Sequence, residues 1–303
     1  RLCLSGTPLE NNLGELWSLF HFVMPGLLYD YNSFIKNFKV PIEKNKDLIR
    51  QKNLAARLEP FMLRRTKQTV LGELPAKTVV IHHVKLGEQQ RDLYESVRIA
   101  MDIKIQKEIG KKGLKRSHII ILDALLKLRQ VCNDPRLVKL PSAKKVKESA
   151  KLEVCIELIQ NCIAQGRKIL VFSSFTSMLA LIGQELHKKK LSYSLLTGVT
   201  RDRSTQINDF QTGITSIFLI SLKTGGVGLN LTAADTVIHY DPWWNPAAEE
   251  QATDRAYRIG QNHPVTVYKL VTEGSVEEKI LVMQNDKRAL FDGLFQTKQQ
   301  GNA

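Results

Sequence analysis

The sequence lacks the features of a membrane protein, of a secreted disulfide-linked domain and of a zinc protein. No apolar run approaches the roughly 20 residues that span a bilayer, and the first residues do not form the apolar core of a signal peptide. Its 4 cysteines, Cys3, Cys132, Cys155 and Cys162, include no pair separated by two residues. We therefore expect an intracellular protein with reduced thiols, no bound metal and no membrane partner.

Two phosphate-holding motifs are also missing. A Walker A loop requires glycine, four residues and then Gly-Lys-Ser/Thr, and no stretch of the chain fits that pattern. No acidic Asp-Glu box follows a predicted strand either. Because the first residue is Arg1 rather than methionine, we expect the sequence to be a piece of a longer chain.

Positive charge is in excess. The chain has 44 lysines and arginines against 30 aspartates and glutamates, which gives a formal net charge of +14 at pH 7. Lys and Arg neutralise phosphates and release counterions, so this excess is typical either of a nucleic-acid partner or of a merely soluble basic surface, and charge alone does not separate the two. Hydrophobic residues at 43% and charged residues at 24% are typical of a globular protein.

The pattern of apolar residues changes along the chain. Residues 1–25 predict a short strand, a turn and a helix, and residues 26–140 read as mostly helical, with no run of alternating strands. After a lysine-rich linker at 139–149, helices alternate with apolar strands at 168–175, 194–196, 216–221, 236–240 and 265–271. This alternation predicts an α/β fold with a parallel sheet covered by helices on both faces. A last helix, capped by Ser275 and Glu278, is predicted to run toward Gly293.

Ligands of such sheets bind at the carboxyl ends of the strands, where one segment carries two arginines. In QATDRAYRIGQ, at 251–261, Arg255 and Arg258 lie three residues apart on a helix predicted at 246–259, so both project from one side. Two guanidinium groups suit the charge that a triphosphate develops in its transition state, as an arginine finger does. A surface ion pair between Arg258 and Asp254 is the alternative that spacing alone favours.

Three further segments combine turn residues with polar or aromatic side chains. The glycines of KTGGVGLNL, at 223–231, bring backbone N–H groups close to a phosphate, or simply form a tight strand-to-helix connection. DPWWNP, at 241–246, starts a helix capped by Asn245 and holds two tryptophans, of which one is a surface stacking group unless both pack between layers. LSGTPLENN, at 4–12, is either a phosphate contact or only a turn before a capped helix.

Together and in this order, the segments resemble the SWI/SNF-type ATPases of helicase superfamily two. LSGTPLENNLGELWSLFHFVMPG resembles motif III and its helix, FMLRRTKQTVLGELPAK the segment that joins two motor lobes, and LRQVCNDPRLV a signature of the helical insertion. KILVFSSF resembles motif IV, LLTGVTRDRSTQINDFQ the motif after it, ISLKTGGVGLNLTAADTVIHYDPWWNP motif V with its extension, and QATDRAYRIGQ motif VI. The last two motifs are highly specific. Tyr257 stands where eukaryotic members commonly have histidine, which indicates a bacterial or archaeal member.

The resemblance implies four parts. Residues 1–25 are the end of a first RecA-like lobe, 26–140 a helical insertion and lobe linker, 141–273 the second RecA-like lobe, and 274–303 a C-terminal brace helix and tail. ATP and Mg²⁺ are implied for the full-length protein, bound mainly by an N-terminal RecA-like lobe that this sequence lacks, so the isolated chain is expected to be inactive. Double-stranded DNA is the implied partner, with RNA polymerase a further one. The implied location is the nucleoid of a prokaryote or the nucleus of a eukaryote.

Roles follow for the residues that match the motifs. The resemblance makes Arg255 and Arg258 the finger pair and places Gln251, Gly226 and Gly228 near the nucleotide. The implied DNA contacts are Lys223, Thr224, Gly225, Trp244, Ser173, Phe175 and Arg203. The resemblance also implies that Ser5, Gly6 and Thr7 couple the nucleotide state to DNA binding.

The leading hypothesis is the C-terminal half of an ATP-dependent double-stranded DNA translocase. The alternative is a catalytically silent DNA- or protein-binding module derived from the same motor fold. A Walker A loop and an acidic box upstream of Arg1 would favour the motor, and their absence from the full-length protein would favour the binding module.

Overall fold

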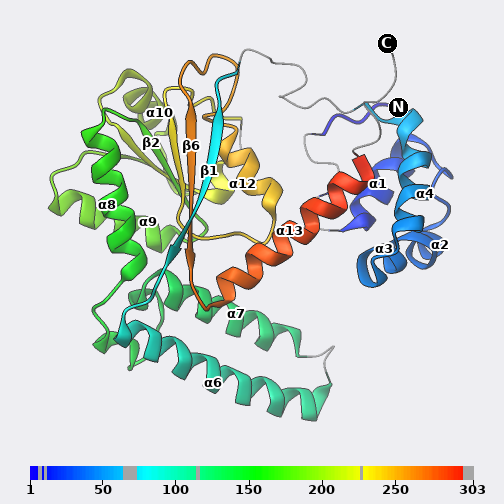
Figure 1. Ribbon diagram of the computed structural model, residues 1–303, viewed down its shortest axis with the longest axis horizontal. Coiled ribbons are helices and arrows are strands. Elements are labelled where there is room, and N and C mark those ends of the chain that lie inside the picture. Colours follow the sequence, from blue (N-terminus) through cyan, green and yellow to red (C-terminus); the bar gives the residue numbers. More distant parts are fainter. Residues whose placement is uncertain (6–8, 10–11, 64–73, 114–116, 226–227, 296–303) are drawn as a thin grey trace. The chain divides into compact units, whose positions relative to one another are not determined.

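The computed structural model describes residues 1–5, 9, 12–63, 74–113, 117–225 and 228–295 (Figure 1). The chain divides into two units, each with its own hydrophobic core. The larger comprises Glu73–Trp243 and Ala248–Leu281, and the smaller comprises Arg1–Gly72, Trp244–Ala247 and Val282–Ala303. The predicted division into four parts stays a prediction.

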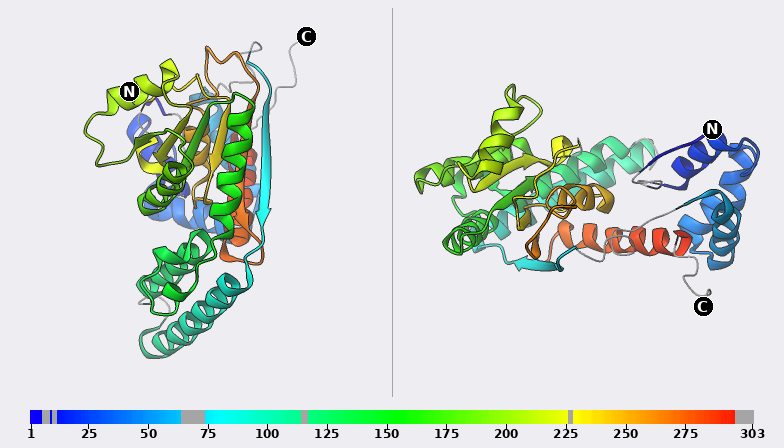
Figure 2. Two further views of the ribbon diagram at one scale, coloured as in Figure 1. Left: turned by 90° about the vertical axis from the view of Figure 1, so that its left-hand side faces the viewer. Right: turned by 90° about the horizontal axis from the view of Figure 1, so that it is seen from above.

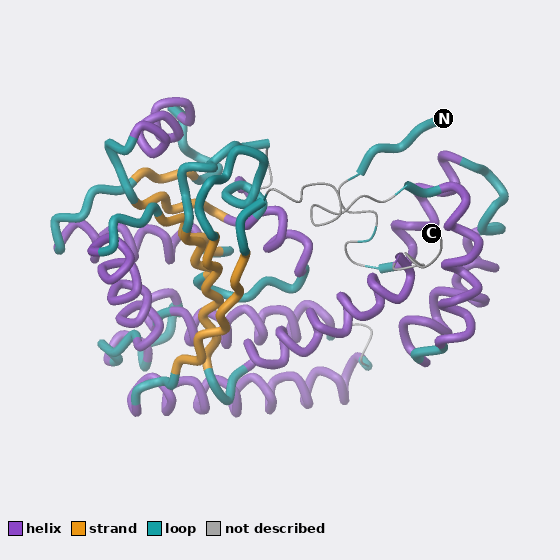
Figure 3. Tube along the Cα trace, turned by 45° about the horizontal axis from the view of Figure 1, so that its top comes forward, coloured by secondary structure: helices purple, strands orange, loops and turns teal. Residues whose placement is uncertain are grey.

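Six strands form one parallel sheet in the larger unit, in the order β1-β6-β5-β2-β4-β3 (Figure 3). The strands are β1 (Lys77–Val84), β2 (Ile169–Ser173), β3 (Ser194–Leu196), β4 (Ile217–Ser221), β5 (Thr236–His239) and β6 (Val265–Thr272). In the centre, Val171 of β2 lies opposite Leu219 of β4 and Ile238 of β5. Together with the helices that connect the strands, this sheet confirms the predicted RecA-like α/β fold.

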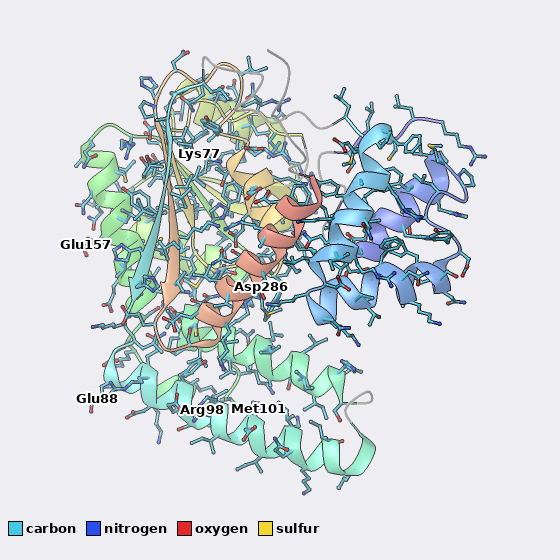
Figure 4. All side chains as sticks on the ribbon, turned by 45° about the vertical axis from the view of Figure 1, so that its right-hand side comes forward. Lys77, Glu88, Arg98, Met101, Glu157 and Asp286 are labelled. Atoms are coloured by element: carbon cyan, nitrogen blue, oxygen red, sulfur yellow. The ribbon has the colours of Figure 1, made fainter. Side chains whose placement is uncertain are left out.

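Helices cover both faces of the sheet (Figure 2). The helices that follow the linker in this unit are α8 (Ala150–Ala164), α9 (Thr176–Lys188), α10 (Arg203–Thr212), α11 (Leu222–Gly225) and α12 (Pro246–Thr253). Because side chains alternate along a strand, Ile169 and Val171 of β2 pack with α8 and α9, while Leu170 and Phe172 pack with residues of α10 and α12. Glu157 lies on the outer side of α8, away from the sheet (Figure 4).

The edge strand β1 corrects the expectation for residues 26–140, which named no strand. It pairs with β6 along its whole length, from Lys77 opposite Val265 to Val84 opposite Thr272. Seven of its eight side chains are exposed, and only Val84 is buried. Without one buried face, the strand has no two-residue alternation of apolar side chains, so its sequence carries no strand signal of that kind.

A pair of helices, α6 (Glu88–Lys112) and α7 (His118–Asn133), precedes the short helices η4 (Pro135–Leu137) and η5 (Ala143–Lys145). Leu93 and Val97 of α6 pack with Leu128 and Val131 of α7. The buried side chain of Gln90 joins three segments, because its Nε2 donates to Val131 O at 2.7 Å and its Oε1 accepts from Ala150 N at 3.1 Å. Helix α6 continues through Gly110 to Lys112.

The smaller unit is helical. Its elements are α1 (Leu13–Val23), α2 (Tyr31–Phe34), η1 (Ile35–Lys39), α3 (Val40–Asn45), α4 (Leu48–Leu58), η2 (Glu59–Phe61) and the later part of α13 (Val276–Phe295). Asn12 caps α1 through Gly14 N at 2.9 Å, and the buried face of α1, with Leu13 and Leu16, packs against Leu294. Residues 1–5 form no strand, contrary to expectation. Helix α13 passes through Gly293, where the absent side chain leaves room for Gln51.

Lys151 and Glu277 form an ion pair with no exposed surface on either side chain. Lys151 Nζ donates to Glu277 Oε1 at 2.6 Å and to Asn133 Oδ1 at 3.2 Å, and Glu277 Oε2 accepts from Thr272 N at 2.8 Å. The pair therefore connects α8 to the start of α13, and the bond to Asn133 connects α8 to the end of α7. Each charge depends on the other, because an isolated charge in such a place has no solvent.

Lys151→Met should lower the free energy of unfolding by about 3–5 kcal/mol, because it leaves Glu277 buried without its cation. The double variant Lys151→Met with Glu277→Leu should recover most of that loss, since two apolar side chains replace the pair without a stranded charge. Urea unfolding followed by circular dichroism measures both values. A double variant as unstable as the single one would contradict this account.

His239 of β5 is buried beside a second charged pair, formed by Glu249 and Lys269. Its Nε2 lies 2.9 Å from Thr253 Oγ1, and its ring stacks on Phe172. Burial lowers the pKa of His239 to about 4, more than the neighbouring Glu249 carboxylate raises it. The imidazole is therefore neutral near pH 7. Burial alone would raise the pKa of Glu249, but Lys269 and His239 lower it overall.

Stability should fall as the pH is lowered from about 6.5 to about 4. In that window the unfolded chain protonates His239 and the folded protein does not, so each pH unit removes up to about 1.4 kcal/mol. The stabilisation is fully present above the unfolded pKa and is lost toward the folded one. His239→Gln should flatten this part of the profile measured by urea unfolding, whereas the exposed control His263→Gln should not. Equal slopes for His239→Gln and the native chain would refute the assignment.

Candidate functional site

The carboxyl ends of β2, β4 and β5 bring three of the predicted segments to one edge of the sheet. Strand β2 leads into Ser173–Phe175, β4 into the glycine-rich segment, and β5 into DPWWNP. These strands are parallel neighbours, so their following loops gather at the same edge.

Asp241, directly after Tyr240, holds two of these loops together. Its carboxylate accepts from Ser173 Oγ at 2.6 Å, from Ser174 N at 3.1 Å, and also from Ser174 Oγ. Both Ser173 and Asp241 are buried. The Ser173 hydroxyl is thus already engaged, and its DNA contact stays a prediction.

Arg129 of α7 supplies the cation for Asp241, with Nη2 and Oδ2 2.9 Å apart. Its guanidinium lies over the rings of Phe175, at 5.0 Å, and Trp243, at 5.2 Å. The ring of Phe175, another predicted DNA contact, therefore packs against this cation and against the core. Arg129, although within the LRQVCNDPRLV signature, had no predicted role.

Helix α12 begins at Pro246, where Asn245 Oδ1 accepts from Ala247 N at 3.0 Å, as the predicted cap requires. Its Glu249 is buried, accepts from Trp243 N at 2.8 Å and pairs with Lys269 of β6. The helix is thereby fixed to the loop after β5 and to the sheet. Its cap and the first helical residues belong to the smaller unit and the rest to the larger.

The two arginines do not lie on a continuous helix, which corrects the prediction of a helix over 246–259. Helix α12 ends at Thr253, and residues 254–260 form successive turns, which we call the arginine turn. Within them, Arg255 O accepts from Leu231 N at 2.9 Å, so the end of the glycine-rich segment is bonded to the arginine turn. In a continuous helix, Arg255 O would accept from the backbone N–H four residues later. Here it accepts from Leu231 N instead.

Gln261 closes this turn from the other side. Its Nε2 donates to Ala234 O at 2.7 Å, to Ala256 O at 3.0 Å and to Thr232 O at 3.2 Å, while its Oε1 accepts from His263 N at 2.9 Å. One buried amide thus connects the turn, through Ala256, to residues 232–234 and to His263. No role was predicted for it, because these partners are backbone groups of three separate segments.

Arg255 and Arg258 differ in their surroundings. Arg255 is half-buried and Arg258 is exposed. Burial lowers the pKa of Arg255, and the positive charge of Arg258 lowers it further against the opposing effect of Asp254.

The glycine-rich segment mixes engaged and exposed residues. Lys223 is exposed on α11, whereas Thr224 is buried with its Oγ1 2.6 Å from Ser221 Oγ. Gly225 ends α11. Gly228 has a φ of 27° with no atom near its missing side chain, and Gly226 lies outside the described residues.

The remaining residues with predicted roles lie in separate parts of the chain. Arg203 is exposed at the start of α10, and Gln251 is half-buried on α12. Trp244 is half-buried in the smaller unit, and its carbonyl accepts from Lys287 Nζ at 3.1 Å. Ser5 is exposed, while Gly6 and Thr7 lie outside the described residues.

Among the described residues, no group of three or more His, Cys, Asp and Glu side chains is arranged to hold a metal ion. In the same part of the chain, no helix combines the length and apolar character of a membrane span.

Comparison with known families divides the chain in two. Residues 1–137 match the SNF2-related domain, and residues 150–260 match the helicase conserved C-terminal domain. The second match contains the whole edge of the sheet described above, from Ser173 to the arginine turn. The first contains α7 and Arg129.

Similar proteins come from bacteria, archaea and eukaryotes. The putative ATP-dependent helicase/translocase YwqA of Bacillus subtilis is 39% identical over 305 residues, which cover 98% of this chain and 32% of that protein. The ISWI chromatin-remodeling complex ATPase ISW1 of Saccharomyces cerevisiae is 35% identical, over 96% of this chain and 26% of that protein. Among solved structures, the Sulfolobus solfataricus SWI2/SNF2 ATPase core in complex with dsDNA has a TM-score of 0.61 and 35% identity, over 96% of this chain and 62% of that one.

The chain thus spans about a third or less of these curated relatives. Its two family matches follow one another along the chain, 12 residues apart, and together take in most of its 303 residues. The chain therefore belongs to the SWI/SNF-type, or SNF2, family of ATPases in helicase superfamily two.

Proposed function

We propose that the protein is the C-terminal half of an ATP-dependent translocase that moves along double-stranded DNA. The observation that carries the proposal is the arginine turn, which is held by Gln261 and Leu231 and presents the half-buried Arg255 beside the exposed Arg258. This turn follows directly from a helix fixed to the sheet, which suits a group that must meet its target in one geometry.

The chemistry expected of the turn is stabilisation of charge during ATP hydrolysis. Phosphoryl transfer spreads negative charge over the oxygens of the γ-phosphate, and a planar guanidinium is able to donate two parallel hydrogen bonds to such oxygens. Arg255 and Arg258 are the proposed finger pair, with Gln251, Gly226 and Gly228 near the nucleotide. A bound γ-phosphate would offset the unfavourable effect that the charge of Arg258 has on Arg255.

The residues that hold ATP and Mg²⁺ are proposed to lie in a preceding N-terminal RecA-like lobe, because this chain has no Walker A loop or acidic box. The chain alone should therefore not hydrolyse ATP. Closing of two lobes around ATP would bring the fingers to the γ-phosphate, and hydrolysis would reopen them. Ser5, Gly6 and Thr7 are proposed to couple nucleotide and DNA states.

Double-stranded DNA is the proposed track. The net charge of +14 and the exposed cations Lys223 and Arg203, on the helices that follow the neighbouring strands β4 and β3, favour a phosphate backbone. A solved relative, the Sulfolobus core, is described in complex with dsDNA. Thr224, Gly225, Trp244, Ser173 and Phe175 complete the proposed DNA-binding set. RNA polymerase as a further partner, a bacterial or archaeal source and a nucleoid or nuclear location remain predictions.

Arg255→Ala or Arg258→Ala in the full-length protein should reduce DNA-stimulated ATP hydrolysis by about 10³-fold or more, the contribution of an arginine finger. ATP affinity should change little, because the proposed binding residues lie elsewhere. Steady-state ATPase assays and binding of a fluorescent ATP analogue measure the two effects. The control is Arg98→Ala on α6, an exposed arginine paired with Glu95. Near-normal turnover in both turn variants would end the finger assignment.

Trp244→Ala should uncouple hydrolysis from movement. Loss of one aromatic contact with DNA removes about 1 kcal/mol or more, so displacement of a triplex-forming strand per ATP hydrolysed should fall about fivefold. ATP turnover should remain. Phe22→Ala, a change of an exposed aromatic residue of the same unit, is the control. Full displacement efficiency in the Trp244 variant would count against a role in tracking.

A further inference from the structure

Arg129 is a buried cation at the junction of three segments that lie far apart in the sequence. Its side chain belongs to α7, and one nitrogen, Nη2, donates to Ser174 Oγ at 2.9 Å, to Asp241 Oδ2 at 2.9 Å and to Pro242 O at 3.1 Å. Only 3% of the residue is exposed. The loops after β2 and β5 are thus both bonded to one atom of the preceding helical segment.

Two aromatic rings also pack against the guanidinium of Arg129. The Phe175 ring centroid lies 5.0 Å and the Trp243 ring centroid 5.2 Å from its central carbon, within the range of cation–π attraction. Lysine has one charged nitrogen and no planar face, so it would reproduce the charge but not this arrangement. The environment therefore specifies arginine rather than a cation in general.

Asp241 and Trp243 continue the connection toward the arginine turn. Asp241 has the Arg129 guanidinium, two serine hydroxyls and a backbone N–H around its carboxylate. Two residues later, Trp243 N donates to Glu249 of α12 at 2.8 Å, and Glu249 pairs with Lys269 of β6. Helix α12 then leads to Arg255. An unbroken series of contacts joins α7 to the arginine turn.

We propose that Arg129 is a positioning residue that couples DNA engagement to the arginine turn, by fixing the Asp241–Trp243 segment against α7. The inference rests on the proposed function, since it assigns a regulatory link within that site. The coupling works through the fixed segment: when Arg129 holds it, Glu249 and α12 keep the turn in the geometry that DNA binding activates. Arg129 itself touches neither nucleotide nor DNA in this role.

The test uses Arg129→Lys in the full-length protein, with ATPase rates measured over a series of linear duplex DNA concentrations. The maximal DNA-stimulated rate should fall about tenfold. The unstimulated rate and the DNA concentration for half-maximal stimulation should stay within about threefold, because the charge is kept and the exposed cations are untouched. Arg136→Lys, which alters an arginine paired with Asp134 in the same segment, is the matched control and should change nothing.

A second variant, Ser174→Ala, removes one partner of Arg129 and one of Asp241 without stranding a charge. It should lower the stimulated rate about threefold, and the double variant with Arg129→Lys should be no worse than Arg129→Lys alone, because both act on one unit. Equal losses of stimulated and unstimulated rates, in parallel with a lower melting temperature, would show that Arg129 only stabilises the fold. A stimulated rate that neither variant changes would also overturn the proposal. A native protein whose ATPase ignores DNA would instead refute the proposed function.

Discussion

The constraint on which this structure depends is the burial of the central strands on both faces. Strands β2, β4 and β5 are fully covered, so their polar and charged neighbours have to leave the core at the strand ends. Charges that remain near those ends are paired: Arg129 with Asp241, Lys269 with Glu249, and Lys151 with Glu277. Two of the pairs, Arg129 with Asp241 and Lys151 with Glu277, connect elements that are distant in the sequence, and the third connects α12 to the strand that follows it. The pairs therefore determine which helix lies against which end of the sheet.

Buried pairs of this kind contribute little to net stability compared with apolar side chains of the same size, because two charges lose their hydration. What they contribute is a single arrangement, since any other packing leaves a charge alone. At the carboxyl edge this matters most, because the loops there are short and carry the proposed site. Asp241 with its four donors fixes two loops together, and Gln261 with its four partners fixes the arginine turn. The site is thus held by polar groups that connect separate segments of the chain.

The sequence predicted those parts of the fold whose signal is local. Strand 194–196 was predicted at its observed bounds, and β2, β4, β5 and β6 within two residues, because short apolar runs between turn residues mark buried strands. Strand β1 was missed because its side chains are exposed and only its backbone pairs with β6. The site residues came from motif resemblance, and their exposure could not be predicted. Ser173 is buried, and the Phe175 ring packs on a cation 46 residues earlier in the chain. The sequence placed Arg129 within the LRQVCNDPRLV signature but gave it no role, because its partners follow more than 40 residues later.

The arginine turn shows most directly how tertiary contacts override a local pattern. The residues from 246 to 259 have helical spacing, yet the helix ends at Thr253. Leu231 N bonds to Arg255 O and Gln261 Nε2 to Ala256 O, so two carbonyls that would accept from the next helical turn are already taken. On a continuous helix, Arg255 and Arg258 would project from one side and have similar exposure. The turn instead leaves Arg255 half-buried and Arg258 exposed. In the proposed function, this asymmetry suits two distinct tasks: Arg255 would be held in place before a nucleotide arrives, and Arg258 would extend from the surface toward it.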